Sequence, residues 1–149
     1  MQGVIAIGRD DHLSDRQAHL LRDVAGIDFS KTRRRHAEAN GPLPAAQLQH
    51  WSAQAGSPGN AARGQTFFNA QHGGEWSCAS CHGTPPTAQG KHASTGKTIA
   101  PLSPAFNAKA FTDTAKVDKW FKRNCNDVLS RACSAAEKAD VLAYLNSLK

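Results

Sequence analysis

The five residues that most constrain this chain are Cys78, Ala79, Ser80, Cys81 and His82, which form a C-x-x-C-H motif. This motif is the attachment signature of c-type haem. Two thiols three positions apart on one turn of helix can each bond to a vinyl group of the same porphyrin, and the histidine directly after them lies under the iron as its proximal ligand. The motif therefore predicts one covalently bound haem c with its iron, held by Cys78, Cys81 and His82.

A redox dithiol and half of a zinc site are the two alternative interpretations of this cysteine pair. A dithiol of the thioredoxin kind is expected after a strand in a βαβ context, and the sequence around Cys78 shows neither. A zinc site needs two further ligands, but Cys125 and Cys133 lie on a different segment, eight residues apart. Haem attachment remains the favoured interpretation.

The composition fits a small domain built around a large apolar group. The chain has 149 residues, which leaves room for one compact core, and only 40% of them are hydrophobic and 7% aromatic. A prosthetic group in the interior would make up for so lean a core. The net charge of +6 either favours acidic redox partners or reflects solubility alone. No apolar run approaches the ~18 residues of a membrane span, so the chain is not expected to be membrane-spanning.

The first 40 residues differ in character from the rest of the chain. They lack the apolar stretch of a signal peptide. Their basic run at 31–36, KTRRRH, has no interleaved aromatic residues and is more typical of a solvated linker than of a site for nucleic acid or anionic lipid. We expect an N-terminal extension of uncertain origin over residues 1–40, a haem domain over residues 41–149, and no nucleic-acid partner.

Two helices are predicted before the motif. Pro44 suits the first turn of a helix that ends near residues 55–60. Asn60 can cap a second helix, which places Gly64 and Phe68 on one face at i and i+4. A glycine at that position would let another helix approach closely.

Two more helices are predicted after a long segment of turn residues, 83–104, that suits a loop wrapped around a cofactor. One begins near a cap at Thr112 or Thr114. The last opens with Ser134 and Glu137 as a capping box and carries a stripe of leucines. The stripe consists of Leu142, Leu145 and Leu148. The predicted class is all-α with large loops.

The sixth ligand of the iron is not the usual one. Electron-carrying cytochromes c commonly use a methionine from a downstream loop, but the sole methionine here is Met1. A histidine, a lysine, an oxygen or amide ligand, or an open position is left. His50, His72 and His92 are reserve candidates.

Helical phasing draws attention to Asn124. It projects from the same helix face as Val117, Trp120 and Phe121, at i, i+3, i+4 and i+7. An asparagine on an inward face needs a partner, which is either the iron or, more commonly, a backbone group at a helix end. Asn126 points elsewhere and is the weaker candidate.

Cys125 and Cys133 are predicted to form a disulfide directly after Asn124. Two free buried thiols are not expected in a compartment where haem is attached. A bridge over so short a loop would fix the end of the helix that carries Asn124.

Four segments together carry a family resemblance. The segments CASCHG, TGKTIAPLSP, FTDTAKVDKWFKRNCND and SRACSAAEKADVLAYL resemble, in order and spacing, the Sphaeroides haem protein (SHP) and cytochrome c'' family, over roughly residues 44–149. The resemblance implies a variant of the class I cytochrome c fold with long haem-wrapping loops. It also implies that the residue before the first cysteine of the bridge is the distal ligand, asparagine in SHP and histidine in cytochrome c''. Here that residue is Asn124.

The expected function depends on a weak, redox-labile ligand. An amide oxygen is a hard donor that suits ferric iron better than ferrous iron, so reduction should loosen Asn124. The high-spin ferrous haem could then bind O2, NO or CO, and other cytochromes, such as a dihaem cytochrome c or a membrane cytochrome b, would supply electrons.

Other functions stay open. One is a plain electron-transfer cytochrome without physiological gas binding, and another is a minor oxygen or nitrogen-oxide reductase activity. A third is a sensor that uses residues 1–40 as its output. Haem attachment and the disulfide indicate the periplasm, although no signal peptide is visible.

Overall fold

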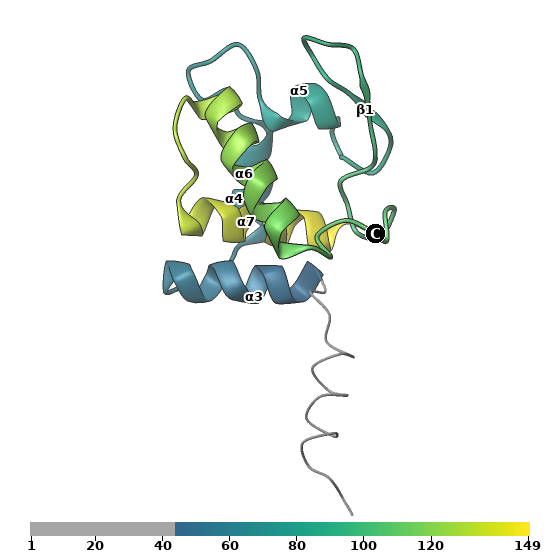
Figure 1. Ribbon diagram of the computed structural model, residues 1–149. Helices are drawn as coiled ribbons and strands as arrows, with labels where there is room; N and C mark the ends of the chain where they lie inside the picture. Colours follow the sequence, from purple (N-terminus) through teal and green to yellow (C-terminus); the bar gives the residue numbers. More distant parts are fainter. Residues whose placement is uncertain (1–43) are drawn as a thin grey trace, which may run out of the picture. The chain divides into compact units, whose positions relative to one another are not determined.

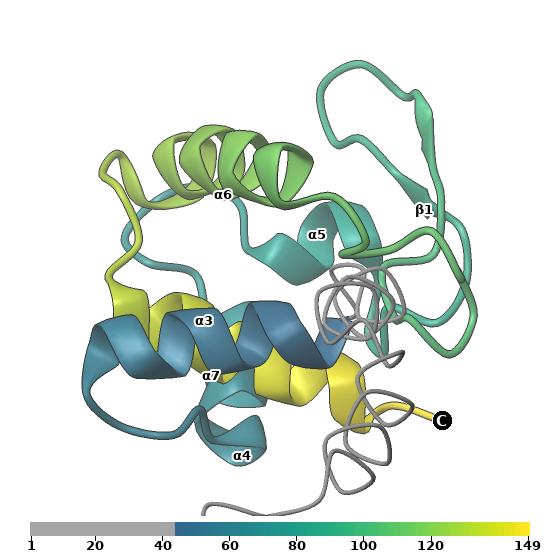
Figure 2. The same ribbon diagram turned by 60° about the horizontal axis from the view of Figure 1, so that its bottom comes forward.

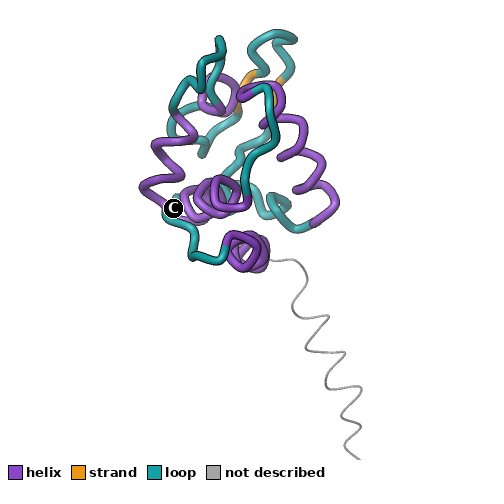
Figure 3. The backbone as a smooth tube through the Cα atoms, turned by 90° about the vertical axis from the view of Figure 1, so that its left-hand side faces the viewer, coloured by secondary structure: helices purple, strands orange, loops and turns teal. Residues whose placement is uncertain are grey.

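Helices and one very short hairpin make up residues 44–149, the part of the chain that the computed structural model describes. Helices dominate and long loops join them, as the all-α prediction requires (Figures 1 and 3). The predicted extension over residues 1–40, with its basic run, lies outside the described residues. The elements are α3 (Pro44–Ala55), α4 (Ala61–Asn69), α5 (Cys78–His82), β1 (Gly90–Lys91), β2 (Thr98–Ile99), α6 (Thr114–Leu129) and α7 (Ala135–Ser147).

The hairpin is the one departure from the predicted class. Strand β1 pairs with β2 in antiparallel register, Gly90 opposite Ile99 and Lys91 opposite Thr98. Each strand has only two residues, too few for any period to show in the sequence. The hairpin lies within the segment predicted as a long loop.

Helix α7 forms the centre of the core and packs against both α3 and α4 (Figure 2). The predicted capping box is confirmed: Ser134 Oγ accepts from the N–H of Glu137 at 3.2 Å, and Glu137 Oε2 accepts from the N–H of Ser134 at 2.7 Å. Leu142 and Leu145 are fully buried, and Leu148 packs at the edge of the core.

Helix α4 crosses α7 at the position where the sequence places a glycine. Asn60 caps α4 by accepting the N–H of Arg63 at 2.9 Å, as predicted. Gly64 and Phe68 are both buried on one face. A Cβ atom built on Gly64 would overlap the carbonyl oxygen of Asp140, so the close approach of the two helices depends on this glycine.

Helix α3 begins at Pro44, as predicted, and covers α7 from the other side. Leu48 and Trp51, the two large apolar side chains of α3, are partly buried. The fully buried residue is Gln47, whose Nε2 donates to Oγ1 of Thr114 at 2.7 Å and so ties α3 to the first residue of α6.

No helix within residues 44–149 combines the length and apolarity that crossing a bilayer requires.

Candidate functional site

The C-x-x-C-H motif forms a single helical turn, α5, because the residues around it favour one there. Ser77 caps the turn and forms a reciprocal capping box with Ser80: Ser77 Oγ accepts the N–H of Ser80 at 3.2 Å, and Ser80 Oγ accepts the N–H of Ser77 at 2.9 Å. Gly83, with a φ of 80°, ends the turn. Cys78 and Cys81 therefore lie one turn apart on the same short helix, as the sequence predicts.

The two cysteines suit thioether formation better than the alternative chemistries. Both are half-buried and neither is in a disulfide. Burial raises the pKa of the Cys78 thiol to about 11, whereas a reactive dithiol needs a lowered pKa. No group of three or more metal-ligating side chains occurs in the described part of the chain, so the zinc interpretation has no support there.

His82 has the environment of a metal-ligating histidine. Burial, with His92 nearby, lowers the pKa of His82 and so favours the neutral ring that can bind iron. Its Nδ1 is buried without a hydrogen-bond partner among the described residues. The hairpin closes on this segment, since a Cβ atom on Gly90 would overlap the carbonyl oxygen of Cys81. The residues of α5 thus fit a covalently attached haem.

Helix α6 carries the candidate distal ligand well inside its length. The predicted cap at Thr112 or Thr114 is wrong: Asp113, which lies between them, accepts the N–H of Lys116 at 3.1 Å, and Thr114 is already helical. The helix continues to Leu129 and ends at Ser130, with a φ of 57°. Asn124 is therefore not a cap, which removes the main alternative role for it.

The environment of Asn124 is only partly the predicted one. Its side chain is half-buried. Val117 is buried and Phe121 packs against the core, as expected. Trp120 is different, because 48% of its surface is exposed and the core does not cover it. The prediction of an inward-facing Trp120 is wrong as far as the polypeptide core is concerned.

The reserve candidates are less suitable than Asn124. The ring of His72 is already engaged, since its Nε2 lies 2.8 Å from the carbonyl oxygen of Phe67. Nδ1 of His92 accepts the N–H of Thr95 at 3.3 Å. His50 and Asn126 are exposed.

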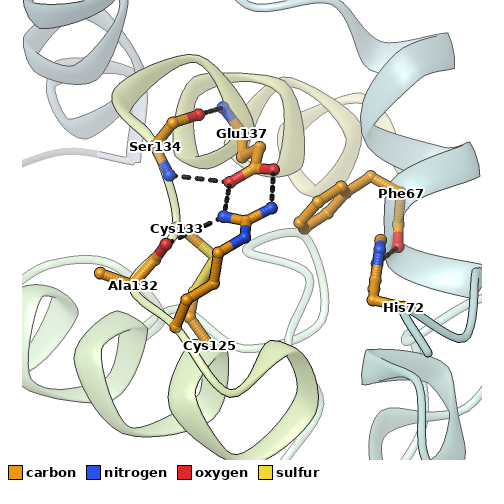
Figure 4. The surroundings of a disulfide bond; sticks show 8 residues. Phe67, His72, Cys125, Ala132, Cys133, Ser134 and Glu137 are labelled. Atoms are coloured by element: carbon orange, nitrogen blue, oxygen red, sulfur yellow. Dashed lines mark hydrogen bonds and ion pairs between the residues drawn. A yellow bond between two sulfur atoms is a disulfide. The ribbon is translucent and has the colours of Figure 1, made fainter. Parts of the chain in front are cut away.

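The predicted disulfide between Cys125 and Cys133 is present, and it begins at the residue after Asn124. The loop it closes is held a second time by Arg131, whose guanidinium makes two bonds to the Glu137 carboxylate at 2.8 and 2.7 Å. Figure 4 shows this carboxylate also bound to Ser134 beside the bridge. The end of α6 is therefore fixed to the start of α7.

Helices α5 and α6 lie on the same side of the layer formed by α3, α4 and α7 (Figures 1 and 2). They do not pack closely on one another. His82 and Asn124 thus belong to two separate helices on one side of the core.

Comparison with known proteins identifies the family. SHP of Cereibacter sphaeroides is 45% identical over 113 residues, which cover 73% of this chain and 87% of SHP. The chain belongs to the SHP and cytochrome c'' family. Cytochrome c'' of Methylophilus methylotrophus is 48% identical over 86 residues, which cover 55% of this chain and 60% of that relative. A domain family of unknown function, DUF1924, also matches residues 54–145.

Solved structures of the SHP and cytochrome c'' family agree with this assignment. Oxidised SHP, described as an oxygen-binding cytochrome c, matches with a TM-score of 0.66 at 45% identity over 70% of this chain and 96% of SHP. Oxidised cytochrome c'' from Methylophilus methylotrophus matches with a TM-score of 0.63 at 36% identity over 71% of this chain and 94% of that protein. The chain is a monohaem c-type cytochrome with a class I-like helical fold, and it carries covalently bound haem c with its iron.

Proposed function

We propose that this cytochrome holds its iron between His82 and a redox-labile Asn124, and that it binds diatomic ligands when reduced. The observation that carries the proposal is the position of Asn124, which lies inside α6, is not a cap, and directly precedes the disulfide. The alternative is a plain electron-transfer cytochrome without physiological binding of gas ligands.

The α5 residues would attach the group and supply the proximal ligand. Cys78 and Cys81 would form the two thioether bonds, and the neutral ring of His82 would bind the iron. The haem would supply one-electron redox chemistry and reversible binding of O2, NO or CO. The protein would control this binding through the side chain of Asn124.

Asn124 would act as the switch because its amide oxygen is a neutral, hard and weak donor. Such a donor suits ferric iron better than ferrous iron, so the side chain should leave when the iron is reduced. Its N–H group could then donate a hydrogen bond to a bound diatomic molecule, and distal donors of this kind decide what a haem does with its ligand. Two relatives support this proposal: SHP is described as oxygen-binding, and a solution structure of cytochrome c'' is described in terms of haem-ligand detachment.

The proposal also includes the electron donors, the cellular location and the domain bounds of this cytochrome. Electrons would come from other cytochromes, such as a dihaem cytochrome c or a membrane cytochrome b. Haem attachment and the disulfide Cys125–Cys133 favour the periplasm. The haem domain would span residues 41–149, with residues 1–40 as an extension.

Visible spectra of the oxidised and the dithionite-reduced protein, with and without CO, test the proposal. We expect a high-spin reduced form that binds CO. In Asn124→Ala the ferric spectrum should change, because the distal ligand is lost, while Asn126→Ala, a change at an exposed asparagine of the same helix, should match the wild type.

Two results would contradict the proposal. A reduced protein with a low-spin spectrum indifferent to CO would favour the plain electron-transfer cytochrome. A ferric spectrum of Asn124→Ala identical to that of the wild type would show that Asn124 does not bind the iron.

A further inference from the structure

Trp120 is a large apolar side chain that the core leaves uncovered. Its exposure of 48% makes it one of two large hydrophobic residues that stand out as exposed in the described part of the chain, the other being Phe106. It lies four residues before Asn124 on α6, so the two side chains are neighbours on one helix face. A single exposed apolar residue is common on protein surfaces, but this indole lies beside the proposed ligand Asn124, where it could contact a bound haem.

The geometry of a helix brings the amide of Asn124 close to this indole. Side chains on an α-helix lean toward its N-terminus, so Asn124 lies over the turn that contains Trp120 and Phe121. Phe121 is already used by the core, where its ring meets Trp51 edge-on with the ring centroids 6.4 Å apart. Trp120 is therefore the apolar neighbour of Asn124 that remains available.

Arg123 restrains the indole. The guanidinium carbon of Arg123 lies 5.6 Å from the centroid of the Trp120 ring, within the range of a cation–π interaction. Arg123 also forms an ion pair with Asp127, one turn further along α6, with 3.8 Å between Arg123 Nε and Asp127 Oδ2. An indole can line a haem site at little entropic cost, because it has only two side-chain torsions to lose.

We propose that Trp120 covers the distal face of the haem beside Asn124 and sets the size of the ligand admitted when Asn124 leaves. The inference rests on the proposed ligand switch. Displacement of one amide opens a small space, and a rigid indole at its edge would keep that space small. Diatomic molecules would enter, whereas branched ligands would meet the indole.

The relative affinities for ligands of different size test whether Trp120 limits the space at the iron. The ferrous holoprotein is titrated with CO, methyl isocyanide and tert-butyl isocyanide, and binding is followed by visible spectra. In Trp120→Ala the affinity for tert-butyl isocyanide should rise at least about tenfold relative to CO, and Trp120→Phe should give a smaller rise. The matched control is Lys119→Ala, a change at the exposed neighbour on the same helix, which should leave the ratio unchanged.

Indole NMR gives a second measurement that does not depend on ligand affinity. In the diamagnetic ferrous CO form, the indole N–H of Trp120, assigned by its loss in Trp120→Phe, should carry a ring-current shift from the haem, with Trp51 of α3 as the internal reference. An unshifted Trp120 resonance, together with an unchanged isocyanide-to-CO ratio in Trp120→Ala, would overturn the inference.

The two proposals fail in different ways. If the ferrous wild type is low-spin and binds neither CO nor methyl isocyanide, the ligand switch is wrong. The ring-current shift of Trp120 is then measured in that diamagnetic ferrous form, where its presence would still support a position over the haem and its absence would refute it.

Discussion

Substitution of Gly64 by alanine tests the close contact between α4 and α7, and two physical effects predict opposite signs for the change in stability. Helix propensity alone favours alanine over glycine inside a helix by about 1 kcal/mol. The packing of α4 on α7 opposes the change, since a Cβ atom at this position would overlap the carbonyl oxygen of Asp140. The sign of the measured change therefore decides which effect dominates.

The structure also gives the magnitude. The added Cβ would lie 2.5 Å from the carbonyl carbon of Asp140 and 2.9 Å from Cβ of Tyr144, whereas ordinary contacts begin near 3.4 Å. The helices must separate by roughly 1 Å, which loosens the packing of the fully buried Leu142 and Leu145. Overpacking and the resulting voids cost about 2–4 kcal/mol in total.

Thermal and urea unfolding of the holoprotein, followed by far-UV circular dichroism, measure this effect. We expect Gly64→Ala to lower the midpoint temperature by about 10–20 °C. The control is Gln65→Ala, at an exposed position of the same helix, which should change the stability little. If Gly64→Ala proved more stable than the wild type, the close approach of α4 and α7 would be refuted.

Two further predictions concern the segment that joins α6 to α7. The Arg131 guanidinium, with the N–H of Ser134, lowers the pKa of Glu137 from 4.5 to about 2. The resulting stabilisation is present above about pH 4.5 and is lost as the pH falls toward 2. Urea unfolding at several pH values should therefore show that the free energy of unfolding falls more steeply with acid in the wild type than in Glu137→Gln. Equal dependence on pH in the two proteins would contradict the ion pair. Replacement of Cys125 and Cys133 by alanine together should lower the free energy of unfolding by about 2.5 kcal/mol, the loop entropy for a separation of 8 residues, and an unchanged urea midpoint would contradict this estimate.

Local chemistry makes much of the fold readable from the sequence. The caps at Asn60 and Ser134 are satisfied by backbone groups three residues away, so their signals lie within one turn of helix. Gly64 is readable for a similar reason, since a glycine on the apolar face of a helix predicts close contact even where the partner is unknown. The disulfide is readable because its two cysteines are so near in sequence.

Contacts between distant segments cannot be read in the same way. Asp140 is buried in α7, where it accepts hydrogen bonds from the Arg63 side chain and from the N–H of Asn60, 80 residues earlier. Burial by itself would raise the pKa of Asp140, but these donors lower it. Gln47 is similar, because only the tertiary structure places Thr114 within its reach.

The error at Trp120 has a different cause. The phase of α6 is predicted correctly, but phase gives only the angle of a side chain around the helix axis. It does not say which neighbour fills that direction. Val117 and Phe121 meet the core, whereas Trp120, on the flank of the same face, does not. For a chain that carries a large cofactor, an apolar stripe can be shared between the core and that cofactor.

The supports of α6 also bear on how a ligand switch would work. The start of the helix is tied to α3 by the bond between Gln47 and Thr114, and its last turns are tied to α7 by the disulfide that begins one residue after Asn124. A helix held near both ends cannot easily retreat from the haem when a ligand is lost. Release of Asn124 would therefore require rotation of its own side chain rather than movement of the helix. Such a switch changes coordination with little reorganisation of the protein, and little reorganisation is what a haem that exchanges electrons with partner proteins needs.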